Sequence, residues 1–111
     1  MLERRLNERR AFHHSIQYQF DEPEEVGAGV AYDLSESGIK ISINEFLPLD
    51  QKIYLRFDMK DHRLMECLSK VVWVAKMPNM DRYQIGLSFE NDDSGLQVQK
   101  DVHQYFLKGL V

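Results

Sequence analysis

The sequence predicts a mainly-β fold, in which about six short antiparallel strands form a barrel or a sandwich and a C-terminal amphipathic helix packs against it. Three observations support this prediction. From Ser15 onward, apolar residues alternate with polar ones through most of the chain, as they do in strands that bury one face. Turn-forming residues separate these stretches at short intervals. Near the C-terminus the alternation gives way to a helical period.

The predicted strands differ in how regular their alternation is. Gly29–Asp33 and a long segment from about Arg63 to Lys76 are the irregular ones, and the second half of the long segment is apolar on both faces, so we expect another part of the chain to cover it. No long helix separates the strands, which favours antiparallel pairing. Four strands alternate regularly, along Ile16-Tyr18-Phe20, Ile39-Ile41-Ile43, Ile53-Leu55-Phe57 and Ile85-Leu87-Phe89.

The C-terminal segment is predicted to be a helix with Ser94 as its N-cap. We expect it to lie on the barrel and to cover the strand around Trp73. Presentation of the helix to a second copy of the chain is the alternative, so the oligomeric state, a homodimer included, stays open. The apolar side chains that recur with helical spacing are Val98, Val102, Tyr105, Phe106 and Leu110.

The chain of 111 residues is long enough for one domain with its own core. We divide it into a flexible arginine-rich N-terminal arm, residues 1–14, and a barrel with its helix, residues 15–111. No apolar run approaches the roughly 20 residues of a membrane-spanning helix, and the charged N-terminus does not suit a signal peptide. We therefore expect a cytoplasmic protein without direct membrane insertion.

The charge is unevenly distributed along the chain. A net charge of −4 argues against a protein that binds nucleic-acid polymers nonspecifically. The N-terminal arm nevertheless carries four arginines against two glutamates. Because salt screens charges over roughly 8 Å, this cluster is able to dominate the field around a small bound anion. The arginines are Arg4, Arg5, Arg9 and Arg10.

Two short patterns carry binding chemistry. In the first, RxxxR, Arg5 and Arg9 stand four residues apart and Arg4 precedes them. A guanidinium holds a phosphate or the O6/N7 edge of guanine with two parallel hydrogen bonds, and it stacks on bases. The alternative is a solvated charged segment in which the arginines pair with Glu3 or Glu8.

The second pattern, DxSxxG, joins two predicted strands and consists of Asp33, Ser35 and Gly38. The carboxylate of Asp33 can accept hydrogen bonds from N1 and N2 of guanine, and the hydroxyl of Ser35 can donate to a phosphate. Gly38 permits a positive φ or the close approach of a ligand. The alternative is an ordinary β-turn with local caps.

Taken together, RxxxR and DxSxxG, separated by 23 intervening residues, resemble the two-part signature of the PilZ family. The strands at Val72-Trp73 and at Tyr83 to Phe89 are also similar to later strands of that family, so the resemblance covers residues 4–89. It implies a six-stranded antiparallel barrel of the split-barrel type with a C-terminal helix.

The resemblance also implies a function, the binding of the bacterial second messenger cyclic di-GMP by a non-enzymatic receptor. Arginines matching Arg4, Arg5 and Arg9 would contact guanine edges and phosphates, and Arg10 would assist. Arg4 in front of RxxxR is associated with an intercalated pair of ligand molecules per chain. Glu8 inside the motif departs from the commonest pattern and would lower the affinity. The barrel side of the site would be Asp33, Ser35 and Gly38, with Trp73 either near the ligand or in the core.

Two other binding functions stay open. The first is a PilZ-like interaction domain that no longer binds a ligand, and the intact motifs argue against it. The second is a small-barrel module for single-stranded RNA that stacks bases on Tyr18, Tyr54 and Phe57, and the scarcity of clustered basic residues on the strands argues against that. The downstream protein partner cannot be named from the sequence.

No group of catalytic residues stands out, so we expect no enzymatic activity, no metal and no cofactor. His13 and His14 lack further ligands at metal-binding spacing. Cys67, the single cysteine, lies in a strand-like run, where a buried thiol acting as a small hydrophobe is expected.

Overall fold

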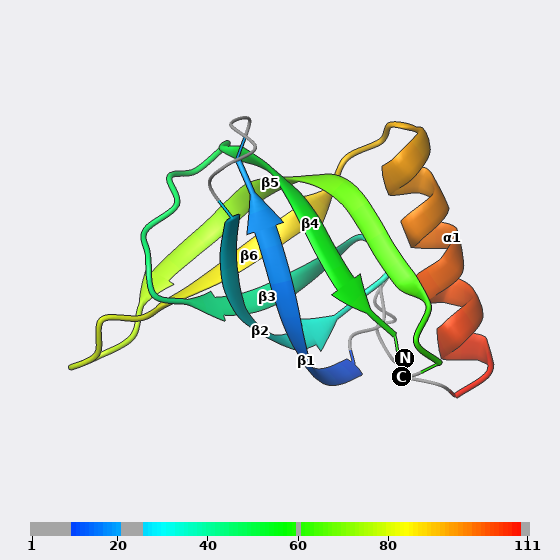
Figure 1. The fold of residues 1–111 in the computed structure, drawn as a ribbon, viewed down its shortest axis with the longest axis horizontal. Helices are drawn as coiled ribbons and strands as arrows, with labels where there is room; N and C mark the ends of the chain where they lie inside the picture. The colour runs from blue at the N-terminus through cyan, green and yellow to red at the C-terminus, as the bar shows by residue number, and fades with distance from the viewer. Residues whose placement is uncertain (1–9, 21–25, 60, 110–111) are drawn as a thin grey trace, which may run out of the picture.

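A computed structural model gives the fold and describes residues 10–20, 26–59 and 61–109, with the backbone alone for residues 10–13. Figure 1 shows a strand barrel with one helix beside it. The elements are β1 (Arg10–Gln19), β2 (Val26–Leu34), β3 (Gly38–Ile43), β4 (Lys52–Asp58), β5 (Leu64–Lys76), β6 (Tyr83–Phe89) and α1 (Asp93–Leu107).

The strands form one closed antiparallel barrel in the order β1-β2-β3-β6-β5-β4, and β4 pairs back with β1. The prediction of a six-stranded antiparallel barrel with a C-terminal helix is thereby confirmed. Closure pairs the strand edges that would otherwise be open to other chains.

The interior of the barrel is filled by the side chains whose alternation predicted the strands. Ile39, Ile41 and Ile43 of β3 are almost fully buried, while Lys40 and Ser42 between them face outward. Burial of an aliphatic side chain of this size stabilises the fold by roughly 1.5–3 kcal/mol. The period-two pattern therefore fixes which face of each regular strand becomes core.

The first strand begins at Arg10, before the predicted boundary at Ser15. Arg10 pairs with Leu34 and Ala11 pairs with Asp33, and a bulge follows between Ala11 and His14. The bulge breaks the alternation, which is why the pattern becomes regular only after it. Residues 10–14 thus belong to the barrel and not to the arm.

The helix docks on its own barrel, against β5 and β6. Its N-cap is Asp92 and not the predicted Ser94, because the carboxylate of Asp92 accepts a hydrogen bond from Gly95 N at 2.8 Å, while the hydroxyl of Ser94 also donates to it. No helix among the described residues is long and apolar enough to cross a membrane. The side chains that pack into the barrel are Val98, Val102, Tyr105 and Phe106.

A polar cluster fixes the same helix to the β4–β5 connection. The hydroxyl of Tyr105 donates to Asp61 Oδ2 at 2.6 Å, and Arg63 lies 3.4 Å from Asp101, which also accepts from Gln97. The hydrogen bond from Tyr105 is the main cause that lowers the pKa of Asp61, and burial is the main cause that raises the pKa of Tyr105.

The second half of β5 is not covered by another part of the described chain, contrary to the sequence-based expectation. Val72 and Trp73 are 51% and 41% exposed, while Val71 is fully buried. The cause is a bulge, since Val71 pairs with Leu87 and Trp73 already pairs with Gly86. The extra residue turns Trp73 to the outer face, so it is not a core tryptophan.

Candidate functional site

The DxSxxG pattern forms the tight connection between β2 and β3, and Ser35 closes it. The side chain of Ser35 is 1% exposed. Its backbone N–H donates to the carbonyl of Gly38 at 2.9 Å, and its hydroxyl lies 3.3 Å from the same oxygen and 3.4 Å from the hydroxyl of Ser37. Ser35 therefore stabilises the turn, and its predicted contact with a phosphate stays a prediction.

Gly38 is required by the close approach of two strands. It pairs with Ser88 of β6, and a Cβ at this position would lie 2.1 Å from the carbonyl oxygen of Leu87. Of the two explanations open from the sequence, a positive φ does not apply, because Gly109 is the one described glycine in that region. The close neighbour in this structure is the protein's own backbone.

A row of outward-facing groups crosses four strands beside this turn. Asp33 of β2 pairs with Lys40 of β3, Lys40 pairs with Gly86 of β6, and Gly86 pairs with Trp73 of β5. Asp33 reaches the outer face because a bulge follows Ala31, as Trp73 does at its own bulge. The bulges in β2 and β5 therefore place Asp33 and Trp73, both predicted as site residues, on the same outer surface of the barrel.

Lys40 lies at the centre of this row and contacts both ends of it. Its Nζ lies 3.8 Å from Asp33 Oδ2 and 5.5 Å from the ring centroid of Trp73, within the range of a cation–π interaction. Gly86 leaves room for the indole, since a Cβ there would meet Trp73 Cβ at 3.2 Å. Sequence reasoning missed both Lys40 and Gly86.

A surface depression beside the turn holds most of this row. It measures about 510 Å³, within the range of small-molecule sites. Its polar lining residues include Ser37, Lys40 and Ser88. The residues around it are Ser37, Gly38, Ile39, Lys40, Val72, Trp73, Gly86, Leu87 and Ser88.

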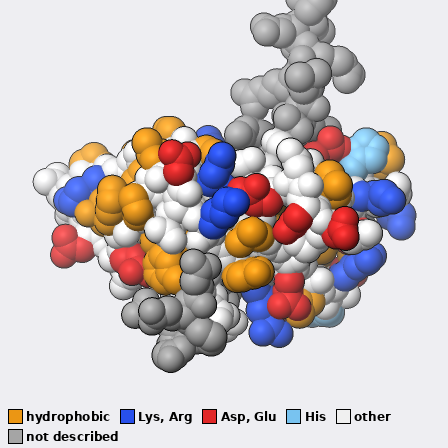
Figure 2. Space-filling view, turned by 90° about the horizontal axis from the view of Figure 1, so that it is seen from above, with side chains coloured by type: hydrophobic (Ala, Val, Ile, Leu, Met, Phe, Trp, Pro, Cys, Tyr) orange, Lys and Arg blue, Asp and Glu red, His pale blue; other side chains and the backbone are white. Residues whose placement is uncertain are grey.

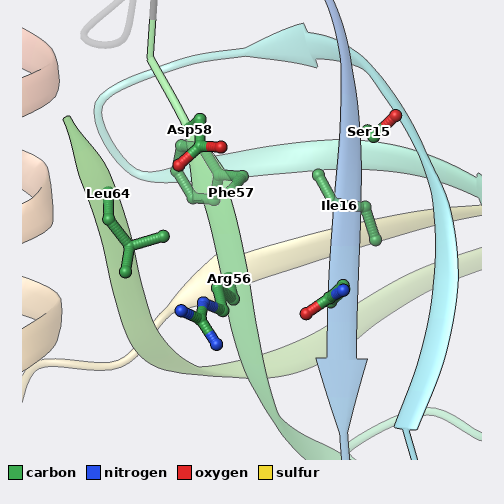
Figure 3. Close-up of a pocket in the computed structure, with 7 residues that line it drawn as sticks. Ser15, Ile16, Arg56, Phe57, Asp58 and Leu64 are labelled. Atoms are coloured by element: carbon green, nitrogen blue, oxygen red, sulfur yellow. The ribbon is translucent and has the colours of Figure 1, made fainter. Parts of the chain in front are cut away.

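Two further depressions lack the residues of the DxSxxG motif. One, of about 420 Å³, lies between β1, β4 and the start of β5, with Arg56 and Asp58 on β4 and Leu64 on β5 (Figure 3). The other, of about 470 Å³, is mainly apolar and is lined by Phe46 and Leu49 among others. It shares Val72 and Trp73 with the depression beside the turn.

The arginine motif cannot be placed, because Arg4, Arg5 and Arg9 lie outside the described residues, as does the side chain of Arg10. The backbone of Arg10 pairs with Leu34, so β1 starts directly beside the DxSxxG turn.

The described surface carries charges of both signs. Figure 2 shows lysine and arginine side chains interspersed with carboxylates and apolar groups on the face in view, without a continuous basic stripe. A protein that follows a nucleic-acid backbone usually presents such a stripe. Among the described residues, the face drawn in Figure 2 does not present such a stripe.

The turn also contacts the helix, since Nδ1 of His103 on α1 interacts with the carboxylate of Glu36 within DxSxxG. Glu36 was an unspecified position of the motif in sequence reasoning, and His103 carried no functional signal. This contact connects the turn to the element that follows the barrel.

Cys67 is buried on the inner side of β5, and burial is the main cause that raises its pKa to about 11. A thiol in this state is a poor nucleophile near neutral pH, so the structure confirms its role as a small apolar side chain. Within the described ranges, no cluster of three His, Cys, Asp or Glu residues is arranged to hold a metal ion.

Comparisons with known proteins identify the family. A family model of the PilZ domain matches residues 3–107, and a search of curated proteins finds no match. The fold is similar to the Bacillus subtilis inhibitor of motility, MotI/DgrA, with a TM-score of 0.76 and 18% identity over 97% of this chain and 52% of that one.

Two structures solved with c-di-GMP are also similar. The PilZ domain of YcgR from Escherichia coli matches with a TM-score of 0.68 and 13% identity over 96% of this chain and 95% of that one. The MrkH complex of K. pneumonia matches with a TM-score of 0.67 and 18% identity over 97% and 54%. The chain spans about half the length of MotI/DgrA and MrkH, and at these identities the likeness shows a shared fold.

Proposed function

Because the chain belongs to the PilZ domain family, we propose that it is a receptor for cyclic di-GMP that acts by binding the ligand and not by catalysis. The observation that carries the proposal is the row formed by Asp33, Lys40, Gly86 and Trp73 on one outer face, at a depression of about 510 Å³ beside the DxSxxG turn. The similar YcgR and MrkH structures contain c-di-GMP, which supports the choice of ligand.

The two ends of the row suit two different surfaces of a guanine base, its N1/N2 edge and its flat face. The carboxylate of Asp33 accepts hydrogen bonds from the adjacent N1 and N2 donors, and the exposed indole of Trp73 offers a face on which the base stacks. Gly38 and Ser35 keep the turn in the shape that presents Asp33.

The arginine motif supplies the positive charge in this proposal. Arg5 and Arg9 hold phosphates and the O6/N7 edges of guanine, and Arg10 assists from the start of β1. Arg4 extends the set so that an intercalated pair of ligand molecules can bind. The arm becomes ordered on the barrel when the ligand binds, and this changes the surface that a downstream protein meets.

The interaction energies are sufficient for micromolar affinity. Ordering a segment on binding costs about 2–5 kcal/mol, while each arginine–guanine pair and each stacked base contributes roughly 1–3 kcal/mol. Two pairs and two stacks outweigh the cost of ordering, and the loss of free motion on association reduces the surplus. A dissociation constant near 1 μM corresponds to about −8 kcal/mol.

The test is calorimetric titration with cyclic di-GMP of the wild type, Arg5→Ala and Asp33→Asn. Asp33→Asn keeps the shape of the side chain and replaces one acceptor by a donor that faces the donors of guanine. We expect micromolar binding by the wild type and a loss of about tenfold or more in each variant, in line with one bidentate contact.

Arg56→Ala is the matched control, because Arg56 lies in a different depression on β4 and its loss removes the same charge. An unrelated RNA oligomer controls for the charge of the ligand. At about 100 times its dissociation constant, cyclic di-GMP should stabilise the wild type by roughly 2.7 kcal/mol. Absence of both heat and thermal shift in the wild type would rule out the receptor function and leave the interaction domain.

A further inference from the structure

Lys40 occupies the positions on the protein that the ligand needs. Its ammonium lies 3.8 Å from the Asp33 carboxylate and 5.5 Å from the centre of the Trp73 ring. In the proposed complex, guanine donors bind that carboxylate and the base covers that ring. An ammonium has three N–H donors and a full positive charge, so it satisfies both groups in place of the base.

The neighbouring residues favour this placement of the Lys40 side chain. Lys40 faces Gly86 across the β3–β6 pair, and the absence of a side chain at Gly86 leaves the space through which the lysine reaches Trp73. Cross-strand pairing with Asp33 on the other side sets the carboxylate next to it. The two contacts therefore follow from strand register and do not depend on a loop.

We propose that Lys40 is an internal competitor for the ligand site. Its ammonium must move away from Asp33 and Trp73 before a guanine base can bind to these two side chains. The proposal rests on the receptor function above and adds a residue that sets how much ligand is needed. Each of the two contacts is modest, because both partners of the pair are partly exposed. Breaking both raises the dissociation constant by about three- to tenfold.

The opposite role, a direct contact between Lys40 and a ligand phosphate, makes a prediction of opposite sign. A phosphate contact would be lost in Lys40→Ala and kept in Lys40→Arg. A competitor is removed in Lys40→Ala, whereas in Lys40→Arg a guanidinium forks onto the carboxylate and stacks on the indole more strongly than the ammonium does. The two variants together therefore separate the two roles.

The experiment is titration of the wild type, Lys40→Ala and Lys40→Arg with cyclic di-GMP, followed by calorimetry and by the fluorescence of Trp73, the single tryptophan of the chain. We expect Lys40→Ala to bind about three- to tenfold more tightly and Lys40→Arg to bind no more tightly than the wild type. Lys100→Ala on the exposed side of α1 removes the same charge away from the site and should leave the affinity unchanged.

A measurement without ligand tests the contact itself. In Lys40→Ala, acrylamide should quench Trp73 more strongly than in the wild type, because the ammonium no longer covers the ring. Unchanged quenching, or Lys40→Ala binding as weakly as or more weakly than the wild type, overturns the proposal while the receptor function stands. Failure of the wild type and of every variant to bind refutes the receptor function and this inference with it.

Discussion

The replacement of Gly38 by alanine is expected to destabilise the barrel itself. The added Cβ would lie 2.1 Å from the carbonyl oxygen of Leu87, far inside van der Waals contact. Because the obstacle is backbone held in the β3–β6 pair, and not the end of a flexible side chain, the two strands must move apart. Overpacking in cores costs typically 1–3 kcal/mol, and we expect a value of about 3 kcal/mol here.

This loss should be visible in thermal unfolding. For a domain of this size, each kcal/mol lowers the midpoint by about 4 °C, so Gly38→Ala should unfold about 12 °C below the wild type. Circular dichroism in the absence of ligand is the assay, since a role of Gly38 restricted to the ligand would lower affinity and leave this midpoint unchanged.

Gly109→Ala provides the comparison. Gly109 has a φ of +69°, and a Cβ added there would meet no atom within 4 Å, so its replacement costs only the left-handed backbone strain, about 1 kcal/mol. If Gly38→Ala unfolds at the same temperature as Gly109→Ala, or above it, close strand approach is not the reason for glycine at position 38.

Three further perturbations test other parts of the fold. Asp92→Ala removes the acceptor for Gly95 N at the start of α1 and should cost about 1 kcal/mol, measured by urea unfolding; an unchanged midpoint would contradict the assigned cap. In Tyr105→Phe, the pKa of Asp61 should rise toward its usual value of 3.8, because the hydrogen bond from Tyr105 is the main cause that lowers it; carbon-detected NMR titration measures this. Since a lowered pKa gives stability that is present above pH 3.8 and lost as the pH falls through the folded-state value, the variant should also lose less stability than the wild type on acidification, and equal losses would refute the link. Cys67 should react with a thiol reagent at about pH 8 only as fast as the protein opens, because burial raises its pKa to about 11; rapid labelling of the native protein would show that it is accessible.

The regular strands could be predicted from the sequence because their side chains obey one rule throughout. Ile39, Ile41 and Ile43 alternate with polar residues and all face the interior. The helix was predictable for the same reason at its own period. Its N-cap was not, since Asp92 and Ser94 are both good caps and the choice depends on which oxygen reaches Gly95 N.

The site could be predicted only in part. The motif residues Asp33, Ser35 and Gly38 could be identified by their pattern, but Lys40 could not, because its contacts depend on the register of β2, β3, β6 and β5. Trp73 was left between core and surface, since a bulge of one residue decides the outcome and leaves no mark in an apolar run. The RxxxR arginines lie outside the described residues, so their roles stay predictions.

The bulges of β2 and β5 shift the alternation of inward- and outward-facing side chains by one residue, while the same apolar side chains still fill the interior of the barrel. Val71 and Val74 both keep contact with the interior although three residue steps separate them, and the inserted position leaves Trp73 free to face solvent. A strand can thus acquire a surface group at no loss of interior volume. Deleting Val72 should restore a regular strand in which Trp73 follows the buried Val71 directly and still faces outward, and replacing Val72 by a polar residue should also be tolerated.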